Sequence, residues 1–267
     1  MNNKNIKRHL RDKITNWTST IEDENIKNII KANAIVSGGA IVSLLNGEEP
    51  HDYDIYFKTK ESIVTVAKYY ANLFNLSQAY STVEIRYEKP DRVECFIKSE
   101  GIAGTKEELT EEEVEDIENT VPTKKAKKPS YSPMFFSTNA ISLSDKIQLV
   151  IRFFGSVEDI HLNFDYVHCT CSYDYDTDKL ILPSKALEAI INKELIYTGS
   201  KYPLCSIIRT RKFIKRGWHI NAGQYVKMAL QLNDMNLKDV DVLREQLTGV
   251  DSAYFEALIA YVNDGLE

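Results

Sequence analysis

The sequence predicts an α+β fold, in which a mixed β-sheet with flanking helices precedes a helical C-terminal part. Short apolar runs alternate with helical stripes up to about residue 184, whereas from Leu187 onward the sequence is helical with few turn signals. We therefore expect an α/β domain over residues 1–184 and a helical domain over 185–267. The 267 residues, 43% hydrophobic and 27% charged, suffice for a real core and exclude a mainly disordered chain.

The net charge and the cysteines limit the classes of protein to which this chain can belong. A net charge of −6 means that the surface as a whole does not attract nucleic acid, so any such contact needs a local basic patch. The four cysteines form no dense framework and are interpreted as reduced thiols. No stretch approaches the roughly 20 apolar residues of a membrane helix, and the N-terminus lacks a signal-peptide apolar run. We expect a cytoplasmic protein without a membrane partner, of undetermined oligomeric state.

The first fifty residues read as two helices that lead into a strand. Ile26, Ile29 and Ile30 recur at helical spacing and predict one apolar face on the second helix. Ser19 and Thr20 precede this stripe and are expected to cap the helix. The following elements are a strand at 34–36, a glycine turn at 37–39, a short helix at 40–45 ended by Asn-Gly, and a strand at 53–57.

The rest of the α/β domain is expected to alternate in the same way. One helix face carries Ile63, Ala67, Tyr70 and Phe74. Further strands are expected at 82–87 and 93–98, joined by a turn at 88–91, and at 147–153, 163–169 and 179–182. About four helices follow, with Asn236 and Asp251 as caps before the last two.

Residues 101–131 differ in composition from their surroundings. An almost entirely acidic run at 107–118 is followed by four lysines at 124–128. Blocks of like charge repel one another and bury little, so a charged, mobile insertion is expected. The alternative interpretation is that these lysines contact a nucleic-acid substrate.

The chemistry is concentrated in residues 36–57. Ser37-Gly38-Gly39 lies at a strand-to-helix turn, where glycines let the backbone approach a ligand and the helix N-terminus favours a phosphate. Asp52 and Asp54 follow on a strand, where residues two apart share a face. Two adjacent carboxylates repel each other, and a divalent cation such as Mg²⁺ relieves that repulsion.

A third acid would allow two metal ions to clamp a phosphoryl displacement. Asp165 is the preferred candidate, because it is framed by bulky strand-forming residues and a carboxylate there needs a partner or an ion. Glu94 has the same local surroundings and is the alternative.

The glycine pair, the short helix and Asp52-x-Asp54 resemble the signature of the DNA polymerase β-like nucleotidyltransferase superfamily. Residues 138–169 also resemble its viral and phage branch, which carries Asn-Ala-Ile, Gln-Leu-Ile and Phe-Asp strands. The resemblance covers residues 30–215 in patches. It implies a nucleotidyltransferase-type sheet with a third carboxylate at Asp165, which the charged insertion separates from Asp54 by an unusually long gap.

The resemblance also implies a mechanism, the template-independent transfer of a nucleoside monophosphate from a nucleoside triphosphate to a hydroxyl. Asp52 and Asp54 would hold two Mg²⁺ ions, with Mn²⁺ as an alternative metal. Asp165 would bind the catalytic ion and help to deprotonate the acceptor. Ser37 and the Gly38-Gly39 turn would hold the β- and γ-phosphates.

Residues 201–216 form a basic segment in an acidic protein. On a helix, Arg209, Lys212 and Arg216 fall on one stripe, which is either a solvated face or a surface facing the cleft between the domains. The resemblance favours the second, because related enzymes place a basic helix over the nucleotide; Arg209 and Lys212 are then nucleotide-binding residues. Asn139 is a candidate contact for a base or sugar, and Arg152 for a phosphate.

Two weaker signals remain open. His168, Cys169 and Cys171 permit a zinc hypothesis, although one Cys-x-Cys without a second pair is a weak motif. The aromatic residues that flank the basic segment either stack on a base or pack in the core; they are Tyr197, Tyr202 and Trp218.

We expect a Mg²⁺-dependent nucleotidyltransferase with an RNA 3′ end, tRNA first, as the acceptor. One alternative keeps the chemistry but transfers to a protein, a small molecule or a second nucleotide. The other is a non-catalytic module that senses nucleotides or binds a partner.

Overall fold

The computed structural model describes residues 2–77, 81–87, 92–99 and 131–247. The chain divides into two compact units. The described part of the first comprises residues up to 99 together with 131–192, and that of the second comprises 193–247. Helix α7 (Ser184–Asn192) belongs to the first unit, so the division lies beyond residue 184. The charged insertion expected at 101–131 lies almost entirely outside the described residues.

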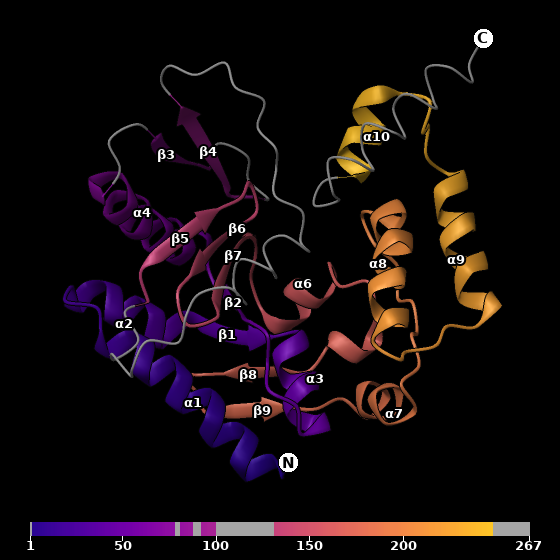
Figure 1. Ribbon diagram of the computed structural model, residues 1–267, viewed down its shortest axis with the longest axis horizontal. Coiled ribbons are helices and arrows are strands. Elements are labelled where there is room, and N and C mark those ends of the chain that lie inside the picture. Colours follow the sequence, from indigo (N-terminus) through magenta and orange to yellow (C-terminus); the bar gives the residue numbers. More distant parts are fainter. Residues whose placement is uncertain (1, 78–80, 88–91, 100–130, 248–267) are drawn as a thin grey trace. The chain divides into compact units, whose positions relative to one another are not determined.

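A seven-stranded mixed sheet forms the centre of the first unit, in the order β5-β6-β7-β2-β1-β8-β9 (Figure 1). Strands β2 and β7 are parallel, and the other neighbouring pairs are antiparallel. The predicted mixed sheet is therefore confirmed. The strands are β1 (Ala34–Ser37), β2 (Tyr53–Phe57), β5 (Pro133–Phe136), β6 (Ala140–Leu143), β7 (Ile147–Phe154), β8 (Ser172–Asp174) and β9 (Lys179–Ile181).

One face of this sheet is covered by α1 (Asn3–Ser19), α2 (Glu24–Asn33) and α4 (Lys60–Ser77). The Trp17 indole N–H donates a 2.6 Å hydrogen bond to the Tyr70 hydroxyl, which ties α1 to α4. From β2, the apolar side chains Tyr53, Ile55 and Phe57 all lie buried on this side. Burial of these side chains stabilises the unit.

The opposite face is covered by α6 (Val157–His161) and the segment that follows it. Ile160 is fully buried and packs with Ile35 and Tyr56, and Phe164 contacts the same cluster. The two faces thus differ: helices cover the first broadly, whereas α6 covers the second locally.

The prediction of a strand at 163–169 is wrong. A capping box at Ser156 and Asp159 starts α6, and Phe164 still donates its N–H to the carbonyl of His161. Asp165 then lies at a bend, followed by the 3₁₀ turn η1 (Val167–Cys169). The local helix end takes up backbone groups that a strand would have paired, so strand propensity is overridden.

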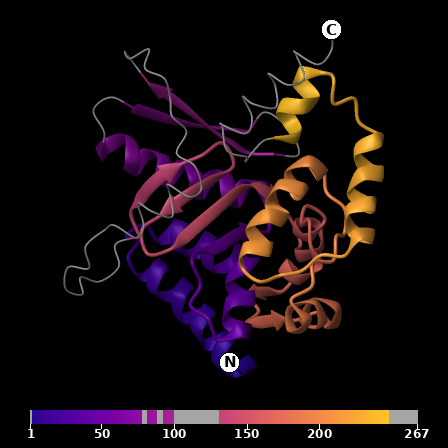
Figure 2. The ribbon, with the colours of Figure 1, turned by 45° about the vertical axis from the view of Figure 1, so that its right-hand side comes forward.

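Strands β3 (Ser81–Arg86) and β4 (Glu94–Ser99) form a separate antiparallel pair that lies against α4 (Figure 2). The pair was predicted; its connecting turn at 88–91 lies outside the described residues. The Asn75 side chain bonds both backbone groups of Val83, at 3.0 Å to the carbonyl and 2.8 Å from the N–H. Asn75 thereby takes the place of a neighbouring strand at this edge.

The cap predicted for α2 is wrong. Ser19 and Thr20 instead donate their hydroxyls back to the carbonyls of Asn16 and Trp17, so they belong to the end of α1. The Asp23 carboxylate accepts the N–H groups of the first turn of α2. A carboxylate is favoured there by the helix dipole.

The second unit contains α8 (Pro203–Lys215), α9 (Ala222–Asn233) and α10 (Val240–Gln246). Asp239, and not Asn236, caps α10, and Asp251 lies outside the described residues. Tyr197 and Trp218 are 4% and 8% exposed and pack inside this unit. Within the described part of the chain, none of the helices has the length and apolar character needed to cross a bilayer.

Candidate functional site

The glycine turn has the predicted strand–turn–helix form. Gly38 adopts φ +90° and ψ −145°, a conformation that favours glycine, and α3 (Gly39–Asn46) begins at the next residue. The N-cap residue of α3 is Gly38, which has no side chain with which to cap the first turn. The first-turn N–H groups of a helix have no partner within the helix, and together with the positive end of the dipole they favour an anion.

Asp54 lies directly against this turn. A Cβ placed on Gly38 would be 3.2 Å from Oδ2 of Asp54, whereas a Cβ on Gly39 would meet nothing within 4 Å. The structure therefore brings together the two features that the sequence singled out. It also gives Gly38 a second role, since a side chain at this position would make a tight contact with this carboxylate.

The alternation of β2 directs its acids away from the core. Tyr53 is 4% exposed, whereas Asp54 is half-buried and Asp52, just before the strand, is exposed. The hydroxyl of Tyr53 lies 2.6 Å from Nε2 of His9 in α1. Burial raises the pKa of Tyr53 to about 12, so it remains a neutral phenol at physiological pH. Neighbouring His51 is exposed, as expected for a loop.

The loop before Asp52 is held in place by Lys146, which lies in the connection between β6 and β7. Lys146 donates its ammonium to the Glu49 carboxylate at 2.7 Å and to the Pro50 carbonyl at 3.2 Å. Its own carbonyl accepts the N–H of Tyr53 at 2.7 Å. These contacts fix the entry of the chain into β2.

Ser37 is fully buried, and its hydroxyl is used inside the protein. Its Oγ donates to the Cys171 carbonyl at 2.8 Å and lies 2.9 Å from Nε2 of His161. Because the single hydroxyl proton goes to Cys171, Oγ accepts from an Nε2–H tautomer of His161. Burial lowers the pKa of His161 and keeps it neutral. The Ser37 side chain therefore anchors the turn.

The two candidate third acids lie on elements other than β2. Asp165 is 7% exposed and lies at the bend after α6, and Glu94 lies on the separate β3–β4 pair, 3.3 Å from Arg92. Among the described residues, no group of three or more His, Cys, Asp or Glu side chains is arranged to hold a metal ion. This applies equally to a zinc site at residues 168–171.

The described donor set therefore does not fit two metal ions held by three acids. Asp52 and Asp54 alone suit one Mg²⁺, which keeps several waters and takes triphosphate oxygens as its remaining ligands.

Asn139 and Arg152 are close together. Arg152 is 6% exposed and donates from Nη1 to Oδ1 of Asn139 at 3.0 Å. Arg152 lies four residues beyond Gln148, the β7 residue paired with Asp54, in the part of β7 where its register with β2 shifts. Arg152 is thus buried and bonded to the half-buried Asn139.

Arg209 and Lys212 lie on α8 of the second unit, where Arg209 is exposed and Lys212 half-buried. Arg216 is the C-cap of this helix and is exposed. The predicted basic stripe is thus present on a helix, where cations near the C-terminus also complement the dipole.

Two polar residues beside Asp54 were missed at the sequence level. Gln148 is paired with Asp54, and Ser142 is paired with Gln148. The available signal was a single polar residue within the apolar run 147–151.

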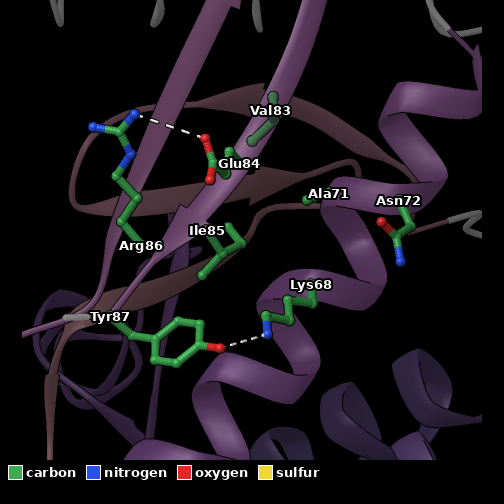
Figure 3. A pocket seen from close by; sticks show the side chains of 8 residues that line it. All are labelled: Lys68, Ala71, Asn72, Val83, Glu84, Ile85, Arg86 and Tyr87. Atoms are coloured by element: carbon green, nitrogen blue, oxygen red, sulfur yellow. Dashed lines mark hydrogen bonds and ion pairs between the residues drawn. The ribbon is translucent and has the colours of Figure 1, made fainter.

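A groove of about 530 Å³ lies elsewhere in the first unit, between α4 and β3 (Figure 3). Lys68 at its edge donates to the Tyr87 hydroxyl at 3.1 Å and lies 4.4 Å above its ring. None of the predicted site residues lines this groove.

Comparison with known families places the α/β unit. The family model for Gabija anti-defense 2 family proteins matches residues 8–193, which include the glycine turn and both β2 acids. The chain belongs to the Gabija anti-defense 2 family. A relative in this family, "Gabija anti-defense 2" of Bacillus phage SPbetaL7, is 22% identical over 238 residues, or 88% of this chain and 46% of the relative. The chain therefore spans about half the length of that relative.

This Gabija anti-defense 2 family member also shows distant structural likeness to tRNA-processing enzymes. The CCA-adding enzyme of Bacillus stearothermophilus in complex with CTP has 13% identity and a TM-score of 0.39, over 86% of this chain and 49% of that one. The Thermotoga maritima CCA-adding enzyme complexed with tRNA has 12% identity and a TM-score of 0.42, over 90% and 52%.

Proposed function

We propose that this protein is a Mg²⁺-dependent, template-independent nucleotidyltransferase that acts against the defence system for which its family is named. It would transfer a nucleoside monophosphate from a nucleoside triphosphate to a hydroxyl acceptor. The observation that supports this most directly is the close approach of the Asp54 carboxylate to Gly38, at the N-terminus of α3. A phosphate site and a metal-binding carboxylate then adjoin one another.

In this proposal the residues of the first unit bind and orient the triphosphate. The N–H groups of the α3 first turn bind its terminal phosphates, and Ser37 holds the turn through Cys171 and His161. A bound Mg²⁺ would supply charge neutralisation at the phosphates, with Asp52 and Asp54 as its protein ligands. Mn²⁺ remains an alternative metal.

The proposed reaction is an in-line displacement. The acceptor hydroxyl oxygen forms a bond to the α-phosphorus, the bond from that phosphorus to the β-phosphate oxygen breaks, and pyrophosphate leaves with the electron pair. The hydroxyl proton passes to a carboxylate, for which Asp165 is the candidate implied by the resemblance.

An RNA 3′ end, tRNA first, is our choice of acceptor. The basic residues of α8 support a polyanionic partner, with Arg209 and Lys212 contacting phosphates. Arg152 and Asn139 are proposed to contribute to the same nucleotide site. A protein, a small molecule or a second nucleotide as acceptor would leave the proposed chemistry unchanged.

One observation favours a second candidate function. Because no three-acid metal group is present in the described part of the chain, a non-catalytic module that senses nucleotides is also consistent with the site. Such a module would bind a triphosphate at the glycine turn without transferring it.

Incubation with labelled nucleoside triphosphates, Mg²⁺ and total RNA distinguishes these functions. We expect label in RNA with the native protein, and no transfer by the Asp52→Ala/Asp54→Ala variant with its thermal stability retained. A matched control is Glu22→Ala/Glu188→Ala, which removes the same charge from two exposed positions. Transfer by the aspartate variant would refute the site, and ATP-dependent thermal stabilisation without transfer would support the sensor.

A further inference from the structure

A row of paired residues extends from Asp54 across the sheet, away from the glycine turn. The register pairs Asp54 of β2 with Gln148 of β7, Gln148 with Ser142 of β6, and Ser142 with Phe135 of β5. Paired residues on neighbouring strands project from the same face of a sheet. These four side chains therefore start from one face, at successive strand spacings of about 4.8 Å.

Burial confirms which face this is. Ile147 and Leu149 on either side of Gln148 are 1% and 0% exposed, whereas Gln148 is half-buried. Phe136 is 3% exposed and packs against Phe74 of α4, while its neighbour Phe135 is 43% exposed. The row therefore lies on the acid face, opposite the side covered by α1, α2 and α4.

Gln148 and Ser142 are the neutral polar side chains of this row. Within residues 2–77, 81–87, 92–99 and 131–247, no hydrogen bond involves the side-chain amide of Gln148 or the hydroxyl of Ser142. The amide can donate and accept at once, and so can the hydroxyl. Beside them, the exposed ring of Phe135 offers a flat apolar surface.

The geometry of an in-line displacement indicates on which side of β2 each substrate lies. The glycine turn extends β1, which lies on one side of β2, and Gln148 belongs to β7 on the other side. In an in-line displacement the attacking and leaving oxygens lie on opposite sides of the phosphorus. If the leaving pyrophosphate lies over the turn, the acceptor hydroxyl must approach from the β7 side.

We propose that Gln148, Ser142 and Phe135 form the acceptor subsite, which binds the terminal nucleoside of a single-stranded nucleic acid. The amide of Gln148 and the hydroxyl of Ser142 bind the ribose hydroxyls, and the ring of Phe135 stacks on the terminal base. This inference rests on the proposed nucleotidyl transfer, because that reaction defines the direction from which the acceptor approaches.

The experiment compares Gln148→Ala and Phe135→Ala with the native full-length chain, using a short single-stranded RNA with a free 3′ hydroxyl. We expect the acceptor KM to rise in both variants, by about tenfold in Phe135→Ala, as loss of one stacked base predicts. The affinity for the nucleoside triphosphate should stay unchanged, which also shows that the site is folded. Met134→Ala is the matched control, since Met134 is the exposed neighbour of Phe135 on the same strand.

Binding of the same RNA without nucleotide, measured by fluorescence anisotropy, reads the subsite independently of chemistry. Weaker binding by Phe135→Ala alongside unchanged binding by Met134→Ala supports the subsite, even if the native protein transfers no nucleotide. Absence of transfer by the native protein would refute only the proposed reaction. Unchanged RNA binding and acceptor KM in both variants would overturn the subsite. Label in a protein hydroxyl and none in RNA would overturn the nucleoside as its occupant.

Discussion

At the scale of single residues, the site depends on the absence of a side chain at Gly38. Its positive φ would strain any other residue, and a Cβ would lie only 3.2 Å from the neighbouring Asp54 carboxylate. Gly39 is next in sequence, yet its Cβ position is open. Two adjacent glycines therefore have different roles, and substitution can separate them.

We predict that Gly38→Ala destabilises the fold by about 1–3 kcal/mol, the usual cost of a strained backbone conformation. Gly39→Ala should leave stability unchanged, because its methyl group meets no atom within 4 Å. Urea denaturation of both variants measures the difference. Equal stability of the two variants would contradict the close approach of Asp54 to Gly38.

Single residues also show where sequence reasoning stops. Gly38, Gly39 and Asp54 could be identified because glycine and acid patterns are local. The engagement of Ser37 with His161 could not, since 124 positions separate the two residues. A serine before a glycine pair looks the same in sequence whether it contacts a ligand or anchors the turn.

At the scale of elements, the spacing of apolar residues predicted those helices and strands that bury an apolar face. The strand 53–57 and the helix that carries Ile63, Ala67 and Tyr70 were predicted correctly, because each has one apolar face. The strand expected at 163–169 failed, because bulky strand-forming residues there follow a capping box and complete a helix end. In that segment, helix capping outweighs the strand propensity of the residues.

The β3–β4 pair provides a test at this scale. We predict that Asn75→Ala costs about 1–3 kcal/mol, because it leaves both backbone groups of Val83 without their partner. Faster hydrogen–deuterium exchange at the Val83 amide should accompany this loss. Asn72→Ala is the control, since Asn72 is exposed on the same helix (Figure 3). Equal exchange in the two variants would show that Asn75 does not hold the edge of β3.

At the scale of the whole molecule, the order of strands decides which residues become neighbours. The α+β class and the helical C-terminal part followed from the sequence. The parallel pairing of β2 with β7 did not, because it joins segments about a hundred residues apart. That pairing sets Gln148 beside Asp54, so the composition of the site depends on topology that local patterns do not contain.

Buried histidines give the stability of the protein a defined pH dependence. Burial lowers the pKa of His168 from 6.5 to about 3, and burial also lowers those of His161 and His9. Above pH 6.5, His168 is neutral whether the chain is folded or unfolded. Below pH 6.5 only the unfolded chain takes up the proton. The contribution of His168 to the stability of the folded protein is therefore fully present at neutral pH and declines as the pH falls toward 3.

We predict that His168 alone contributes a slope of about 1.4 kcal/mol per pH unit between pH 6 and 4. The measurement is urea denaturation of the native protein and of His168→Gln across this range. Any constant difference reflects altered packing, whereas the difference in slope isolates the imidazole, because all other groups titrate in both proteins. Parallel stability curves would mean that His168 takes up a proton in the folded protein as readily as in the unfolded chain.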